Sequence, residues 1–233
     1  MAKNYTINTH EQPSLVSLGG CDFFIDPDVV FEGLFEIRID KPRIPYPKST
    51  HIGRGTWVQS GAIIYPGVTI GDNCLIGYNT VIRENTIIGN NTTIGAHSQV
   101  EGNIVIGKNC SIWTHAHLTA FMSIGDNVFI APRFTALNDP VMSYKRPYMQ
   151  KRRIIKGPTI EDNVRISGNV VVQPGIVIGE EALIGTSALV TKDVGKAEIV
   201  YGVPAKIMGI VPICNTFGYK EGSDGGASEK EHS

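Results

Sequence analysis

Three histidines are the residues of this sequence best suited to proton transfer. His97 and His115 lie 18 positions apart, and His117 follows two positions after the second. An imidazole changes its charge near neutral pH, with a reference pKa of about 6.5, so it can accept a proton from a substrate that it reaches. Whether these side chains reach a substrate depends on the structural element that carries them.

The histidines fall within a repeat of six residues. A branched aliphatic residue occupies every sixth position from Ile52 to Ile130, and again from Ile160 to Val190. Neither a helix nor a flat sheet has this period, which is typical of a β-solenoid whose hexapeptides each supply one short strand and one turn. If three hexapeptides close one coil, residues 18 apart stack on successive coils, about 4.8 Å apart.

This stacking rule gathers one column of polar residues, in the order Asn79, His97, His115 and Arg133. Asn recurs at the same position of other hexapeptides and tolerates a left-handed backbone, so the column should stand at an outward corner. His117 lies between two inward-facing positions and should point outward on the same side. His97 is either a binding residue or an ordinary corner residue where other coils use Asn.

A long loop interrupts the repeat over residues 136–157, and loops of this length are more often functional than idle. Asn138 and Asp139 open the loop, and because the coil after His115 leads into it, we expect them near His115. The loop is also cationic, which indicates either a solvated face or a contact with phosphates: it holds Lys145, Arg146, Lys151, Arg152, Arg153 and Lys156.

Composition and length indicate one domain. Residues 1–51 lack the repeat and should cap the solenoid of residues 52–210, and the Gly-rich and Ser-rich tail of residues 211–233 should be flexible. The 21 Lys and Arg against 22 Asp and Glu argue against a general nucleic-acid binder. No apolar run approaches a membrane span and the first residues are polar, so a cytoplasmic location is expected. The four cysteines show no spacing typical of zinc or of a disulfide framework.

The repeat, the loop and the closing segment from Gly185 to Lys206 together resemble the left-handed β-helix acyltransferases that use acetyl-CoA or another acyl-CoA. That segment contains Gly185-Thr186-Ser187-Ala188-Leu189-Val190-Thr191-Lys192-Asp193-Val194 and Gly202-Val203-Pro204-Ala205-Lys206. Residues 126–135, followed by Asn138-Asp139-Pro140, resemble the branch that acylates an amino group of a UDP- or dTDP-linked deoxy sugar. That branch commonly has Phe-Thr-Asn-Asp, where this chain has Phe-Thr-Ala-Leu-Asn-Asp. The predicted fold is all-β, a left-handed parallel β-helix with an excursion loop and an irregular N-terminal cap.

The resemblance implies a homotrimer with active sites between adjacent solenoids, acetyl-CoA as the acyl donor, and no required metal. Ser167 and Gly185 stand 18 apart as small residues, so they leave a groove open in which the pantetheine arm of the donor could lie. Thr191 and Lys192 would approach the phosphates of CoA.

For the acceptor, the resemblance implies an amino sugar whose uncharged amine attacks the thioester. His115, with His117 in reserve, would take the proton of the amine or position it. Asn138, Asp139 and His97 would bind the sugar.

Three other functions are alternatives to this prediction. O-acylation of a sugar or small alcohol is the nearest, but enzymes of that kind often carry a histidine in the loop, where this chain offers Asn138. A γ-type carbonic anhydrase needs a second histidine five positions after His97, where Gly102 stands. A non-catalytic solenoid would lack the groove that Ser167 and Gly185 leave open.

Overall fold

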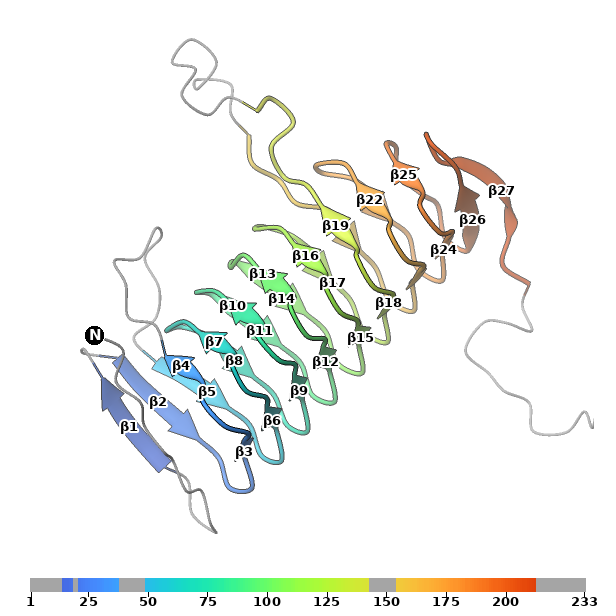
Figure 1. The fold of residues 1–233 in the computed structure, drawn as a ribbon. Coiled ribbons are helices and arrows are strands. Elements are labelled where there is room, and N and C mark those ends of the chain that lie inside the picture. The colour runs from blue at the N-terminus through green and yellow to red at the C-terminus, as the bar shows by residue number, and fades with distance from the viewer. Residues whose placement is uncertain (1–13, 19–20, 38–48, 143–153, 213–233) are drawn as a thin grey trace, which may run out of the picture.

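The computed structural model describes residues 14–18, 21–37, 49–142 and 154–212. In these ranges the chain forms short strands and no helix, and the strands wind into a left-handed β-helix with three flat sides (Figure 1). The predicted fold class is confirmed. No helix long and apolar enough to cross a membrane occurs among the described residues.

Each side of the β-helix is one sheet, here named A, B and C in the order in which the chain visits them. Sheet A contains, in spatial order, β1 (Ser14–Leu18), β2 (Cys21–Ile25), β5 (Ser49–Ile52), β8 (Thr69–Ile70), β11 (Thr86–Ile88), β14 (Ile104–Ile106), β17 (Ser123–Ile124), β20 (Thr159–Ile160) and β23 (Val177–Ile178). Sheet B contains β3 (Val30–Phe31), β6 (Trp57–Val58), β9 (Leu75–Ile76), β12 (Thr93–Ile94), β15 (Ser111–Ile112), β18 (Phe129–Ile130), β21 (Arg165–Ile166), β24 (Leu183–Ile184), β26 (Glu198–Tyr201) and β27 (Lys206–Ile210). Sheet C contains β4 (Glu36–Ile37), β7 (Ile63–Ile64), β10 (Val81–Ile82), β13 (Gln99–Val100), β16 (His117–Leu118), β19 (Thr135–Ala136), β22 (Val171–Val172) and β25 (Leu189–Val190).

The predicted stacking of residues 18 apart is the register of the sheets. Ile82 pairs with Val100, and Val100 pairs with Leu118, in parallel strands of sheet C. The aliphatic residue of each hexapeptide points inward, and Ile82, Val100 and Leu118 have no exposed surface. Burying one such side chain contributes about 1.5–3 kcal/mol, so the repeated aliphatic column is the main source of stability.

The solenoid begins earlier than residue 52. β2, β3 and β4 pair in parallel with β5, β6 and β7, and therefore form an additional coil within the segment expected to be an irregular cap. Cys21, Phe23 and Ile25 are buried at alternating positions of β2 and close the core at this end. β1 runs antiparallel to β2, covers its edge and is the terminal strand of sheet A at this end.

The corners adopt the left-handed backbone that the recurring Asn predicted. Asn79, His97, His115 and Arg133 have φ between 55° and 64°, all at the corner between sheets B and C, here called the BC corner. The corner between sheets A and B, the AB corner, carries its own column of Asn residues. Asn and His suit these positions because a left-handed backbone costs them less free energy than it costs β-branched or bulky apolar residues.

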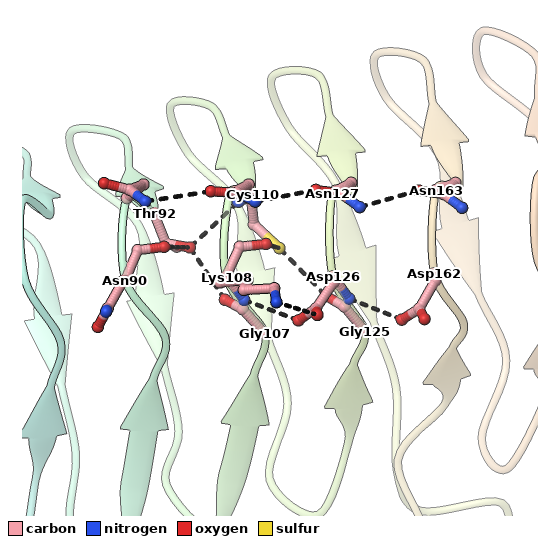
Figure 2. Close-up of polar contacts among 12 residues, drawn as sticks. Asn90, Thr92, Gly107, Lys108, Cys110, Gly125, Asp126, Asn127, Asp162 and Asn163 are labelled. Atoms are coloured by element: carbon pink, nitrogen blue, oxygen red, sulfur yellow. Dashed lines mark hydrogen bonds and ion pairs between the residues drawn. The ribbon is translucent and has the colours of Figure 1, made fainter. Parts of the chain in front are cut away.

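At the AB corner the Asn side chains form a ladder of hydrogen bonds along the solenoid (Figure 2). The amide of Asn91 donates to Asn109 at 3.2 Å, Asn109 to Asn127 at 3.1 Å, and Asn127 to Asn163 at 3.0 Å. The last step joins residues 36 apart, because the excursion loop intervenes. The ladder therefore continues the solenoid in register across the interruption.

The excursion leaves the solenoid after β19, at the corner between sheets C and A, here called the CA corner (Figure 1). The amide N–H of Lys156 donates to the carbonyl of Asn138 at 3.0 Å, so the two ends of the loop are joined where they meet the coil. Residues 143–153 lie outside the described part, and with them five of the six cations of the loop.

Candidate functional site

The candidate residues fall at different edges of the solenoid. His97 and His115 stand at the BC corner. Ser167 and Gly185 are the first residues of the same corner on later coils, at least two coils further along. His117 lies on the outer face of sheet C, in β16. Asn138, Asp139, Thr191 and Lys192 follow strands β19 and β25 at the CA corner. Sheet C therefore separates His115 from the loop residues that were expected near it.

His117 is held beside a carboxylate on the neighbouring coil. Its Nε2 lies 3.6 Å from Oε1 of Glu101, and both side chains are 39% exposed, so solvent and a ligand can reach them. The other oxygen of Glu101 accepts hydrogen bonds from the hydroxyl of Thr119 at 3.2 Å and from the N–H of Ala120 at 3.3 Å. Glu101 is thereby fixed in place, within ion-pair distance of the imidazole.

Asn138 belongs to the same side of sheet C as this pair. Its Nδ2 donates to the carbonyl of Ala120 at 3.2 Å, and the N–H of Ala120 binds Glu101. The backbone of Ala120 thus connects Asn138, near the start of the excursion, to the carboxylate that faces His117. The structure associates Asn138 with His117 rather than with His115.

Asp139 has a local structural role. Its Oδ1 accepts hydrogen bonds from the N–H groups of Val141 at 3.1 Å and Met142 at 2.9 Å, which shape the first turn of the excursion. This geometry is that of an Asx turn. Its proposed contact with a substrate stays a prediction.

His97 and His115 stack on one another at the BC corner. Their ring centroids are 5.1 Å apart with an interplanar angle of 25°, and both residues are exposed. The backbone N–H groups of His97 and His115 donate to the backbone carbonyls of Tyr78 and Ala96 on the preceding coil, and these hydrogen bonds hold the corner in register. No carboxylate is paired with either ring among the described residues.

The residues expected to bind the donor lie in three surroundings. Ser167 lines a groove of about 450 Å³ on the outer face of sheet B, together with Ser111, Phe129 and Arg165. Gly185 is buried, because the ring of Tyr201 from β26 lies over it and would overlap a Cβ atom there. Thr191 and Lys192 are exposed beyond β25, on sheet C.

Sequence reasoning missed Glu101 and Tyr201, for different reasons. Glu101 stands 18 positions before Thr119, so the stacking rule contained the signal, although it was applied only to the histidine column. Tyr201 faces Gly185 across a separation of 16, since the last coil is shorter than the others. Within the described ranges, no group of three or more His, Cys, Asp or Glu side chains could hold a metal ion.

The described coil defines the class of protein, a hexapeptide-repeat β-helix. The bacterial transferase hexapeptide family (six repeats) matches residues 49–84, 85–120 and 157–192, which lie on either side of the excursion. The hexapeptide repeat of this family of transferases therefore runs through the solenoid on both sides of the excursion, as the sequence predicted. No curated protein matches the chain significantly.

Several solved structures are similar to the chain. One is the UDP-N-acetylglucosamine acyltransferase of Francisella novicida, with 22% identity, a TM-score of 0.43, and coverage of 80% of this chain and 70% of that one. The corresponding protein of Campylobacter jejuni has 16% identity, a TM-score of 0.47, and coverage of 80% and 74%. A mutant of the N-acyltransferase AntD from Bacillus cereus, in complex with dTDP and coenzyme A, has 20% identity, a TM-score of 0.44, and coverage of 70% and 85%.

Proposed function

We propose that the chain is an acyl-CoA-dependent N-acyltransferase that acts on the amino group of a UDP- or dTDP-linked deoxy sugar. The family supports group transfer, and the closing segment with Gly202-Val203-Pro204-Ala205-Lys206 supports acyl-CoA as the donor. The observation that carries the proposal is the pairing of His117 with Glu101 beside Asn138, because amide formation needs a base for the proton of the amine.

The proposed reaction is a direct transfer without a covalent enzyme intermediate. The amine nitrogen attacks the thioester carbonyl, the C–N bond forms, and the C–S bond breaks. The amine proton passes to His117, and the thiolate of CoA leaves and takes up a proton. Because Nε2 is the ring nitrogen nearest Glu101, the carboxylate favours a proton there and leaves Nδ1 to accept the proton of the amine.

The positions of the candidate residues support a homotrimer. Ser167 opens a groove on sheet B, whereas His117 points outward from sheet C, and these two sides of a solenoid face different directions. A donor in the groove of one copy could meet the His117 of a neighbouring copy across a cleft between them. A cyclic arrangement that repeats one such contact three times closes into a trimer.

The test is thiol release from acetyl-CoA with a panel of UDP- and dTDP-linked 3-amino and 4-amino sugars and their hydroxyl analogues. Release with one amino sugar, and not with its hydroxyl analogue, is expected. Release with a hydroxyl analogue alone would assign O-acylation instead. Sedimentation of the purified chain checks the trimer separately, and a monomer that is fully active would contradict the cleft between copies.

A further inference from the structure

The groove on sheet B is lined by a cation that has no counterion among the described residues. Nη2 of Arg165 is buried and has no hydrogen-bond partner among the described residues. Leaving a charged donor unpaired costs free energy. Arg165 also lines the groove, so an anionic ligand bound there can pair with its guanidinium through a charge-assisted hydrogen bond.

The surroundings of Arg165 favour an anion. Among the described residues that line the groove, Arg165 alone is charged. Glu181, at the AB corner of the next coil, also has a buried oxygen without a partner, and no ion pair joins it to Arg165 within the part of the chain described. The charge of Arg165 is therefore available to a ligand.

The other walls indicate the size and chemistry of that ligand. Phe129 and Leu183 flank Arg165 on the two neighbouring strands, since they pair in register with it, and they offer apolar surface. Ser111 and Ser167 also line the groove and add hydroxyl donors. A volume of about 450 Å³ is that of a site for a small organic molecule rather than for a single ion.

We propose that the groove on sheet B is a binding site for a diphosphate-bearing ligand, with the guanidinium of Arg165 as the phosphate anchor and Phe129 as an apolar wall. A planar guanidinium matches phosphate oxygens in a bidentate fork, and hydroxyls spread along the groove suit a ligand with several acceptor oxygens. CoA and the nucleotide of a nucleotide sugar both carry a diphosphate. Their role as the ligand rests on the proposed function, whereas the site itself does not.

The experiment is isothermal titration calorimetry of the full chain with pyrophosphate, CoA, UDP, dTDP and, as a dicarboxylate control, succinate. The variants are Arg165→Gln, Arg165→Lys and Arg54→Gln. The last removes the same charge from an exposed residue at the AB corner of an earlier coil, far from the groove. Circular dichroism and thermal unfolding check that each variant is folded.

We expect at least one diphosphate probe to bind, and Arg165→Gln to weaken its binding by about tenfold or more, as loss of a charge-assisted hydrogen bond implies. The affinity of Arg165→Lys for the probe should lie between those of Arg165→Gln and the parent chain, and Arg54→Gln should bind the probe as tightly as the parent chain. An effect on CoA alone identifies the donor as the occupant, and an effect on UDP or dTDP alone identifies the acceptor.

Three results would overturn the proposal. One is equal binding by Arg165→Gln and Arg54→Gln, and another is binding of succinate without any diphosphate. The third is that no probe binds while Arg165→Gln changes the mass in solution, because the guanidinium would then pair with a second copy. Thiol release separates the two proposals: diphosphate binding through Arg165 without any release leaves the site standing and rejects the acyltransferase.

Discussion

Nε2 of His117 lies 3.6 Å from Oε1 of Glu101, and the two residues stand on adjacent coils of sheet C. Glu101 is fixed by two further hydrogen bonds, from Thr119 and from the backbone of Ala120. A fixed carboxylate beside an imidazole is the arrangement of a general base and the group that positions it. Among the described residues, the other imidazole paired with a carboxylate is that of His51, which lies beside Asp26 at the N-terminal end of the solenoid, away from the excursion.

Removing either member of this pair should reduce turnover while the fold survives. His117→Gln removes the proton acceptor, and we expect kcat to fall by about 10²–10⁴-fold, the usual range for a general base. Glu101→Gln keeps an oxygen that can accept the hydrogen bonds from Thr119 and Ala120 but removes the charge, so kcat should fall less than in His117→Gln. Gln99→Ala, on the strand next to His117, is the control and should keep the kcat of the parent chain. Steady-state thiol release measures all three, and unchanged kcat in His117→Gln would remove this residue from the mechanism.

His115 should contribute little to the chemistry, because it stacks on His97 at the BC corner and Asn fills this position on other coils. His115→Asn keeps a residue that tolerates the left-handed backbone. We expect kcat and the shape of its pH dependence to stay within about twofold of the parent chain, since the proton acceptor is untouched. A fall of kcat comparable to that of His117→Gln would return the catalytic role to His115, the residue that the sequence favoured.

The sequence predicted most of the fold because one period determines it. A buried aliphatic every six residues defines the coil, and the coil defines which residues stack, as the pairs Ile82 with Val100 and Val100 with Leu118 demonstrate. The additional first coil was missed because Ile25 pairs with Ile52 across 27 residues, which the period cannot reveal.

The site was predicted less well, because stacking gives neighbours along the axis but not around the coil. The column with His97 and His115 followed directly from the 18-residue rule, whereas the side at which the excursion leaves requires the assignment of every corner. Gly185 illustrates a second limit. Its small size predicted an open groove, but the short last coil places Tyr201 opposite it, and the ring fills the space.

The Asn ladder should stabilise the coils on both sides of the excursion. Asn127 accepts from Asn109 and donates to Asn163, and its φ is 56°. Asn127→Ala removes both hydrogen bonds and places Ala in a left-handed backbone, so we expect a loss of about 1–3 kcal/mol in the free energy of unfolding. Asn127→Gly removes the same hydrogen bonds without the backbone cost and should lose less. Urea unfolding measures both, and equal losses would mean that the hydrogen bonds alone matter.

Burial of two thiols should make the protein less stable at alkaline pH. Cys74 and Cys110 are 2% and 1% exposed, and desolvation raises the pKa of both above the ordinary thiol value of 9.0. In the folded chain they stay protonated and donate to the carbonyls of Gly89 at 3.2 Å and Gly125 at 3.1 Å. In the unfolded chain they release their protons near pH 9.0, so the unfolded state binds fewer protons above that pH and the free energy of unfolding falls as the pH rises.

The column that holds these thiols offers a matched replacement. Thr56 and Thr92 occupy the same inward position on the alternate coils, where their hydroxyls donate to Gly71 and Gly107. Cys74→Thr with Cys110→Thr keeps a hydrogen-bond donor and removes both titrating groups. The free energy of unfolding, measured with urea between pH 7 and 10, should then fall less steeply with rising pH than in the parent chain. Tyr78, whose pKa is raised by its hydrogen bond to Glu32, is common to both proteins, so the difference between the two curves reports the thiols. Parallel curves would show that the buried thiols do not couple folding to pH.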